Sequence, residues 1–93
     1  MEDIKKYKNQ FYIGEDVTNP LAKIMFVPKG KSKIIIESTY VSNSLRGQGT
    51  GLQLVKKVVE YARHENKKII ARCPYAKKVM RTSVEYKDIL IIF

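Results

Sequence analysis

The chain has 93 residues, of which 18 are lysine or arginine and 9 are aspartate or glutamate, so its formal net charge is +9. A chain of this length forms one domain over residues 1–93 and buries roughly two-thirds of its unfolded surface in a single small core. The single cysteine excludes an internal disulfide, and the sequence contains neither the apolar core of a signal peptide nor the roughly 20 apolar residues of a membrane helix, so we expect a cytoplasmic protein.

The first part of the chain predicts three β-strands in a meander. Residues 8–13, 21–27 and 33–41 are rich in β-branched and aromatic side chains, and turn-forming residues separate them. The short connection at residues 28–31 predicts that the second and third strands pair antiparallel. The third strand leads into a loop that contains three glycines.

From residue 49 the hydrophobic period becomes that of a helix. Apolar side chains recur three and four residues apart through residues 49–64, which predicts an amphipathic helix packed on the sheet. A short strand at 68–72 should lie parallel to the strand at 33–41, because a helical crossover joins them. A second helix over 75–83 and a final strand over 89–93 complete an α/β (α+β) fold.

Between the third strand and the first helix lies the hexapeptide Arg46-Gly47-Gln48-Gly49-Thr50-Gly51. Glycines at alternate positions let the backbone curl tightly, so that consecutive N–H groups point at one anion, and the helix adds its positive dipole end. The spacing G-x-G-x-G fits neither the dinucleotide fingerprint nor the P-loop, which needs a lysine directly after its last glycine. The hexapeptide therefore predicts a site for the pyrophosphate of a phosphorylated cofactor.

The pattern R-x-x-G-x-G between strand and helix resembles the segment that GNAT acetyltransferases place around the pyrophosphate of coenzyme A. The stretch 41–46, the tetrapeptide Arg72-Cys73-Pro74-Tyr75 and the pair Glu85-Tyr86 are similar to a compact GNAT subgroup of roughly this length. The resemblance covers residues 33–88 and implies a mixed, mostly antiparallel sheet with a splayed central strand pair and two helices. In that fold the pantetheine arm of the coenzyme enters the gap between the splayed strands.

The resemblance implies that acetyl-coenzyme A or coenzyme A contacts the end of the third strand, the glycine loop and the second helix. The residues concerned are Tyr40, Val41, Arg46, Gly47, Gln48, Gly49, Thr50, Gly51, Cys73 and Lys78. Backbone groups near Val41 would hydrogen-bond the pantetheine arm as an added strand does. Tyr40 either lines the pocket or fills it. Arg46 either contacts the pyrophosphate or braces the loop, and Lys78 either reaches the 3′-phosphate or belongs to a solvated basic face.

Acetyl transfer to an amine needs a general base, a donor for the thioester oxyanion and an acid for the departing thiolate. Glu37 is a candidate base or else a cross-strand salt-bridge partner, and a backbone N–H near Val41 is a candidate oxyanion donor. Tyr75 is a candidate acid, a pocket wall or a hydrophobic cap. Cys73 either accepts the acetyl group as a nucleophile or packs as a small buried hydrophobe. His64, the only histidine, caps the helix end rather than acting in catalysis.

The sequence thus predicts an enzyme that moves an acetyl group from acetyl-coenzyme A to a primary amine, on a small molecule or a protein. The short chain lacks the N-terminal helices that form an acceptor wall in longer relatives, so the acceptor site is open or is completed by a partner subunit. One alternative is a non-catalytic coenzyme A binding or sensor module. Another is a basic nucleic-acid-binding domain, disfavoured because the sequence has no base-reading basic helix, zinc ligands or RNP-type aromatic motif. The acceptor and the oligomeric state stay open.

Overall fold

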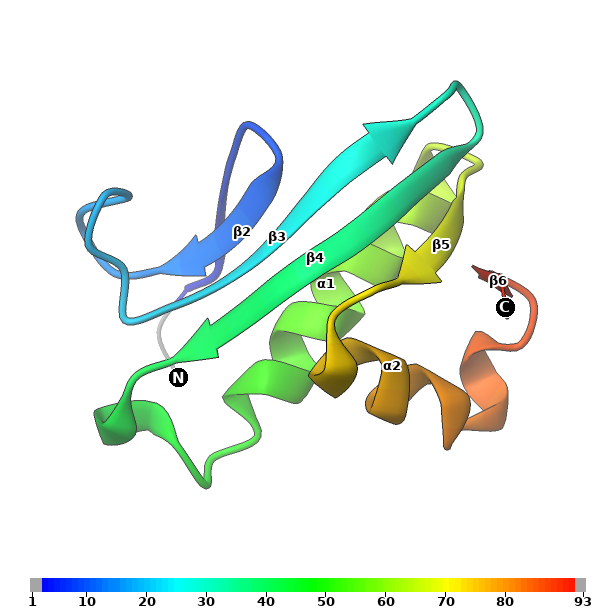
Figure 1. The fold of residues 1–93 in the computed structure, drawn as a ribbon. Coiled ribbons are helices and arrows are strands. Elements are labelled where there is room, and N and C mark those ends of the chain that lie inside the picture. Colours follow the sequence, from blue (N-terminus) through cyan, green and yellow to red (C-terminus); the bar gives the residue numbers. More distant parts are fainter. Residues whose placement is uncertain (1–2, 92–93) are drawn as a thin grey trace.

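The computed structural model describes residues 3–91, which form a six-stranded sheet and two helices (Figure 1). The strands lie in the sheet in chain order, and they are β1 Lys5–Tyr7, β2 Gln10–Ile13, β3 Ala22–Lys29, β4 Lys33–Val41, β5 Lys68–Ala71 and β6 Leu90–Ile91. The helices are α1 Thr50–His64 and α2 Pro74–Arg81, with short 3-10 turns at Asn43–Leu45 and Val84–Tyr86. Strands β1 to β4 pair antiparallel, whereas β5 is parallel to β4 and to β6. The predicted mixed, mostly antiparallel sheet with two helices is confirmed.

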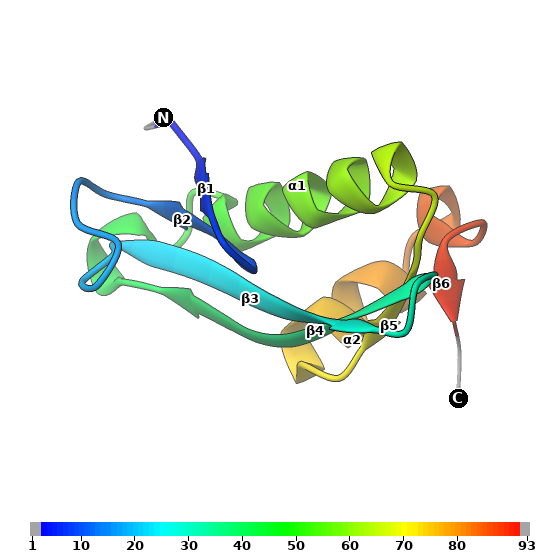
Figure 2. The same cartoon turned by 90° about the horizontal axis from the view of Figure 1, so that it is seen from above.

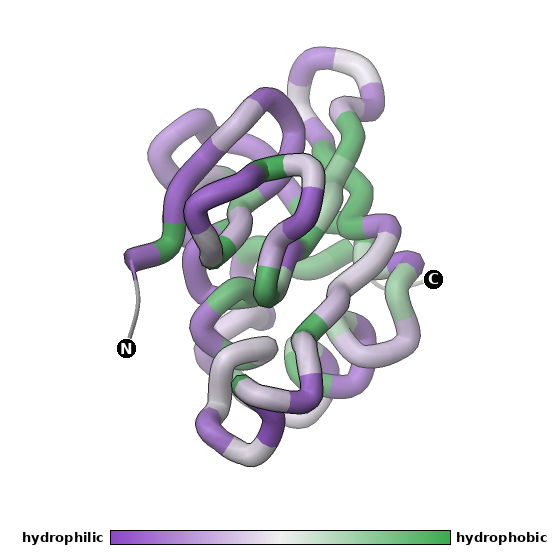
Figure 3. Tube along the Cα trace, turned by 90° about the vertical axis from the view of Figure 1, so that its left-hand side faces the viewer, coloured by the Kyte–Doolittle hydropathy of each residue, from purple (hydrophilic) through white to green (hydrophobic). Residues whose placement is uncertain are grey.

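Helix α1 covers one face of the sheet because its apolar side chains form a single stripe (Figure 2). The buried members of the stripe are Leu54, Val55, Val58, Val59 and Ala62. Full burial of a valine or leucine side chain stabilises a fold by about 1.5–3 kcal/mol, so a charged residue at Val58 would unfold the domain. Figure 3 shows the hydrophobic residues toward the middle of the molecule and hydrophilic residues along its outer turns. Among residues 3–91, neither helix is both long and apolar enough to cross a membrane.

A β-bulge interrupts the pairing of β3 with β4. Phe26 pairs with Ile36, but the preceding residue Met25 pairs with Ser38, which leaves Glu37 as an extra residue in β4. Successive side chains of a strand point to opposite faces of the sheet, so one extra residue reverses the alternation beyond it. The bulge therefore decides which side chains of the last part of β4 face the helices.

Beyond the bulge, Thr39 and Val41 face the helices. Thr39 pairs with Ile24 and Val41 pairs with Ala22, and both partners are fully buried in the core that α1 covers. Tyr40 accordingly lies on the opposite face of the sheet, where 47% of it is exposed. Without the bulge the side chains of β4 from residue 38 onward would have exchanged faces.

Strands β4 and β5 part after four residue pairs. Residues 33–36 pair with residues 68–71, and the N–H groups of Arg72 and Cys73 both donate to the carbonyl of Ile36, each at 3.0 Å. β4 then continues to residue 41, while the chain after β5 turns away into α2 (Figure 1). The edge of β4 from residue 37 onward is thus left open toward β5, which is the splayed pair that the resemblance implies.

Several element boundaries differ from those that the sequence predicts; for example, the second helix spans Pro74–Arg81 rather than 75–83. Residues 8–13 are not one strand, because Lys8 (φ 52°) and Asn9 form the turn of a hairpin between β1 and β2. Strand β3 runs on through Pro28 and Lys29 rather than ending at residue 27, since Pro28 still pairs with Ile34. Of the predicted final strand, residues 92–93 lie outside the described part of the chain.

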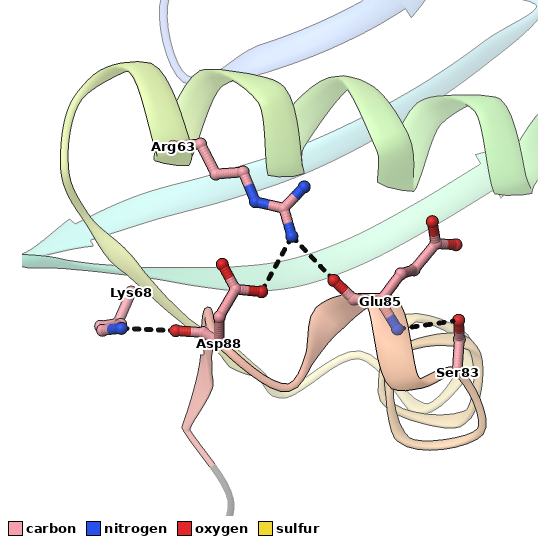
Figure 4. Close-up of polar contacts among 5 residues, drawn as sticks. All are labelled: Arg63, Lys68, Ser83, Glu85 and Asp88. Carbon is pink, nitrogen blue, oxygen red and sulfur yellow. Dashed lines mark hydrogen bonds and ion pairs between the residues drawn. The ribbon is translucent and has the colours of Figure 1, made fainter.

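The C-terminal segment is tied to the end of α1 (Figure 4). The guanidinium of Arg63 donates through Nη2 to the carbonyl of Glu85 at 2.7 Å and to Oδ1 of Asp88 at 2.9 Å. The ammonium of Lys68 donates to the carbonyl of Asp88. The hydrogen bond from Arg63 lowers the pKa of the Asp88 carboxyl below its usual value. These contacts fasten the molecule at the end of α1 that lies away from the glycine loop.

Candidate active site

The glycine loop adopts a backbone conformation that favours glycine. Gly47 has φ 81° and Gly49 has φ 76°, both in the left-handed region, which side chains with a Cβ rarely adopt. No described atom lies within 4 Å of a Cβ built at either position. The loop is therefore open on this side, and a ligand can approach its backbone closely.

Gly49 is the N-cap of α1. Its carbonyl accepts a hydrogen bond from the N–H of Gln53 at 3.1 Å, while an α-helix cannot pair the preceding N–H groups of its first turn internally. The N–H groups of Thr50, Gly51 and Leu52 thus meet at the positive end of the helix dipole. This arrangement binds anions in proteins generally.

Side chains of the loop hold its shape. Arg46 donates through Nε to the carbonyl of Val41 at 3.1 Å, and Gln48 donates through Nε2 to the carbonyl of Ser44 at 3.2 Å. The hydroxyl of Thr50, which is buried, donates to the carbonyl of Leu45 at 3.3 Å. Arg46 therefore braces the loop, and its contact with the pyrophosphate stays a prediction.

Gly51 serves a different purpose from the other two glycines. Its backbone is helical, but a Cβ built on it would lie 2.8 Å from Cζ and from the hydroxyl oxygen of Tyr75. The missing side chain therefore lets the Tyr75 ring, near the start of α2, lie across the first turn of α1. Partial burial, with a smaller effect of the nearby Cys73 thiol, raises the pKa of Tyr75 above its usual value, although 42% of the residue is exposed.

The open edge of β4 presents backbone N–H and carbonyl groups to the gap between β4 and β5. The N–H of Ser42 donates to the carbonyl of Leu21 at 2.8 Å, so the pair of Val41 with Ala22 is one in which neither residue bonds the other. The N–H and carbonyl of Val41, and those of Thr39 two residues earlier, consequently point away from β3 and toward the gap. Arg46 donates a hydrogen bond to the carbonyl of Val41. The N–H of Val41, and the N–H and carbonyl of Thr39, therefore face the gap without this contact.

Cys73 lies where the gap closes. It is the N-cap of α2, it is 5% exposed, and its Sγ lies 3.5 Å from Oγ1 of Thr39. The thiol thus packs into the core and also borders the gap between β4 and β5.

Glu37, the extra residue of the bulge, is paired with Arg72. Oε2 of Glu37 lies 3.4 Å from Nη1 of Arg72, and the arginine side chain is 65% exposed. The cross-strand salt bridge considered for Glu37 is therefore present, and it anchors the carboxylate beside the gap.

These elements surround a cavity of about 330 Å³ that is lined by Thr39, Val41, Leu45, Arg46, Gly47, Gly49, Thr50, Gly51 and Tyr75. The structure thus brings together most of the predicted loop residues with Val41 and Tyr75. Gln48 braces the loop from outside the lining, and Lys78 is exposed on α2 without lining the cavity. Tyr40 does not line it either, because the bulge turns Tyr40 to the other face.

Thr39 and Leu45 also line the cavity, and neither is among the site residues predicted from the sequence. Leu45 is an apolar residue directly before a glycine-rich loop, which is a usable signal for a pocket wall. Thr39 carries no such signal, because its direction depends on the bulge at Glu37.

The family model of the GCN5-related N-acetyl-transferases matches residues 10–89. Among solved structures, the chain is similar to the solution structure of a GCN5-like protein from Staphylococcus aureus, with 43% identity and a TM-score of 0.84, over 98% of this chain and 89% of that chain. It is also similar to an acetyltransferase from Vibrio fischeri, with 16% identity and a TM-score of 0.51, over 69% of this chain and 59% of that chain, which is a likeness of fold alone. No curated protein matches the chain.

Proposed function

The chain belongs to the GCN5-related N-acetyltransferase family and is an acetyltransferase; we propose that its cavity binds acetyl-coenzyme A and that the acceptor is a primary amine. One observation carries this proposal. The first-turn N–H groups of α1, two left-handed glycines and the open edge of β4 border the same cavity. An anion-binding end and an extended strand edge in one cavity suit a ligand that joins a pyrophosphate to a long polar arm.

Different residues bind different parts of the ligand. The N–H groups of the glycine loop and of Gly51 hold the pyrophosphate, and the open backbone groups of Thr39 and Val41 pair with the pantetheine arm. Bound acetyl-coenzyme A would supply the acetyl group as a thioester, which is the activated form that an amine can attack. The N–H of Val41 would then stabilise the oxyanion.

Two side chains beside the gap suit the proton transfers. An alkylammonium has a pKa near 10.4, so a base must take its proton, and Glu37 is the carboxylate held beside the gap by Arg72. Tyr75 lines the cavity, and a tyrosine hydroxyl carries its proton at neutral pH. Its hydroxyl donates that proton to the departing thiolate.

Cys73 has two roles open to it. Its burial and its contact with Thr39 support packing that positions the gap, whereas its place beside the gap supports a nucleophile that carries the acetyl group. Mass spectrometry of the protein incubated with acetyl-coenzyme A separates them, because only a nucleophile retains the added acetyl mass on Cys73. Loss of activity in Cys73→Ala without any acetylated intermediate would leave packing as its role.

The first test replaces Gly49 by valine. A β-branched residue at a left-handed position costs about 1–3 kcal/mol of strain, and relief of that strain would turn the loop N–H groups away from the ligand. We expect calorimetry to show loss of coenzyme A binding by a protein that is still folded. Gly30→Val is the matched control, because Gly30 also has a left-handed φ, at 65°, and open surroundings but lies in the turn between β3 and β4. Equal affinity of the two variants for coenzyme A would show that the glycine loop does not hold the pyrophosphate.

The second test measures thiol release from acetyl-coenzyme A with a panel of amines. Release that depends on the amine establishes primary amines as the acceptor class. Tight binding of coenzyme A without release for any amine would instead support the non-catalytic binding or sensor module. A gel shift at physiological salt tests nucleic acid, whose binding would weaken steeply with salt and ignore the Gly49 variant.

A further inference from the structure

A second cavity lies on the face of the sheet away from α1. It has a volume of about 240 Å³ and is lined by Lys29, Ile35, Ile70, Ala71, Arg72 and Lys77. Ile35 and Ile70 pair across β4 and β5 and are only 7% and 8% exposed, although α1 packs on the opposite face (Figure 2). The cavity thus combines an apolar floor with cationic walls from β3, from the end of β5 and from α2.

Three lysines extend the positive charge along this face. Lys29 pairs directly with Lys33 across β3 and β4, and Lys33 pairs directly with Lys68 across β4 and β5. Like charges directly opposite each other destabilise a sheet. Lys68 turns its ammonium to the carbonyl of Asp88 (Figure 4), whereas an anion bound near Lys29 and Lys33 would offset their repulsion.

The second cavity borders the candidate active site. Arg72 lines this cavity and holds Glu37 at 3.4 Å, and the next residue, Cys73, touches Thr39, which lines the first cavity. The two cavities therefore approach the gap between β4 and β5 from opposite faces of the sheet. Glu37 lines neither cavity, but a molecule in the second cavity would contact Arg72, the partner of Glu37, without entering the space that the first cavity offers to the coenzyme.

We infer that the second cavity is the acceptor site and that the acceptor is an anionic amine, a molecule whose primary amine is joined through an apolar spacer to a carboxylate or phosphate. This inference rests on the proposed function. The amine faces the carboxylate of Glu37, the spacer lies on Ile35 and Ile70, and the anionic group binds Lys29 and Lys77. A polycation is rejected, because the face that would bind it carries the same sign of charge.

The test compares three acceptors that share one alkyl chain: ω-aminohexanoate, hexylamine and diaminohexane. We expect kcat/KM for thiol release to favour ω-aminohexanoate over diaminohexane by on the order of ten-fold. The variant K29Q/K77Q should abolish most of this preference, chiefly through KM. K56Q/K87Q is the matched control, since it removes two exposed lysines outside this cavity and lowers the net charge equally. ω-Aminohexyl phosphate extends the series and distinguishes a phosphate-bearing acceptor from a carboxylate-bearing one.

Equal rates for the three amines, or equal loss of preference in the two double variants, would overturn the inference. Hexanoate gives a readout that needs no turnover. It should shift the methyl NMR signals of Ile35 and Ile70 in the wild type but not in K29Q/K77Q, and absence of these shifts would also overturn the inference. Failure of the proposed function is seen separately, as calorimetry without coenzyme A binding, whatever hexanoate does.

Discussion

The two ends of α1 are built in opposite ways. At its C-terminal end, Arg63 bonds both Glu85 and Asp88, and the N–H of Lys67 donates to the carbonyl of Ala62 at 2.8 Å. At its N-terminal end, backbone N–H groups remain without internal acceptors and two glycines hold left-handed conformations. Groups left ready for a ligand cost stability. The comparison therefore separates a fastened end, which serves the fold, from an open end, which serves binding.

The largest effect should come from adding one methyl group at the open end. The variant Gly51→Ala keeps a helical backbone, and alanine is favoured over glycine in a helix by up to about 1 kcal/mol. The new Cβ would lie 2.8 Å from the Tyr75 ring, which must move because the ring is the more mobile partner. Misplacement by about 1 Å costs on the order of 100-fold in rate. We expect kcat/KM to fall by roughly that factor while thermal unfolding is unchanged or slightly later.

The background Tyr75→Ala supplies the control for this prediction. Without the ring, Gly51→Ala meets no clash, so the two changes together should be no worse than Tyr75→Ala alone. Additive losses would mean that Gly51 matters through its N–H group and not through the room it leaves for Tyr75.

A smaller effect at the same end tests the hydroxyl of Tyr75. In Tyr75→Phe the ring still packs over Gly51, but the proton donor is lost, so we expect kcat to fall about ten-fold with little change in coenzyme A affinity. Partial burial raises the pKa of the hydroxyl above the ordinary tyrosine value near 10. The difference in kcat between the wild type and Tyr75→Phe should therefore persist beyond about pH 10 and disappear only above the raised pKa. Tyr40→Phe is the control, because Tyr40 lies on the other face of β4. An unchanged kcat in Tyr75→Phe would reduce Tyr75 to a pocket wall.

The two ends also differ in what the sequence reveals. The glycine loop, the bounds of β4 and the start of α1 are local patterns, and the prediction agrees with the structure at each of them. The direction of Thr39 and Tyr40 depends on the bulge at Glu37, which directly follows Ile36, the last residue of β4 that pairs with β5. Strand alternation read from sequence alone assigns these side chains to the wrong faces. Likewise, the reason for glycine at residue 51 lies in Tyr75, a residue far along the chain.

The smallest effect is expected at the fastened end, where Arg63→Ala should lower the unfolding temperature by a few degrees and leave coenzyme A affinity unchanged. The ends of a 15-residue helix are about 20 Å apart, so changes at the two ends should add independently. Arg81→Ala is the control, because Arg81 is also an exposed arginine in the last turn of a helix, α2. A loss of coenzyme A affinity in Arg63→Ala comparable to that in Gly51→Ala would show that the two ends are coupled.

The pH dependence sharpens this last prediction. The hydrogen bond from Arg63 lowers the folded-state pKa of Asp88 below its ordinary value of 3.8, so the contribution of the carboxylate to stability is fully present above the unfolded-state pKa. It is lost as the pH falls through the lower folded-state pKa. The difference in unfolding temperature between the wild type and Arg63→Ala should therefore be constant near neutral pH and become smaller in acid. A difference that persists after Asp88 is protonated would assign the stabilisation to the hydrogen bond from Arg63 to the Glu85 carbonyl, which does not titrate.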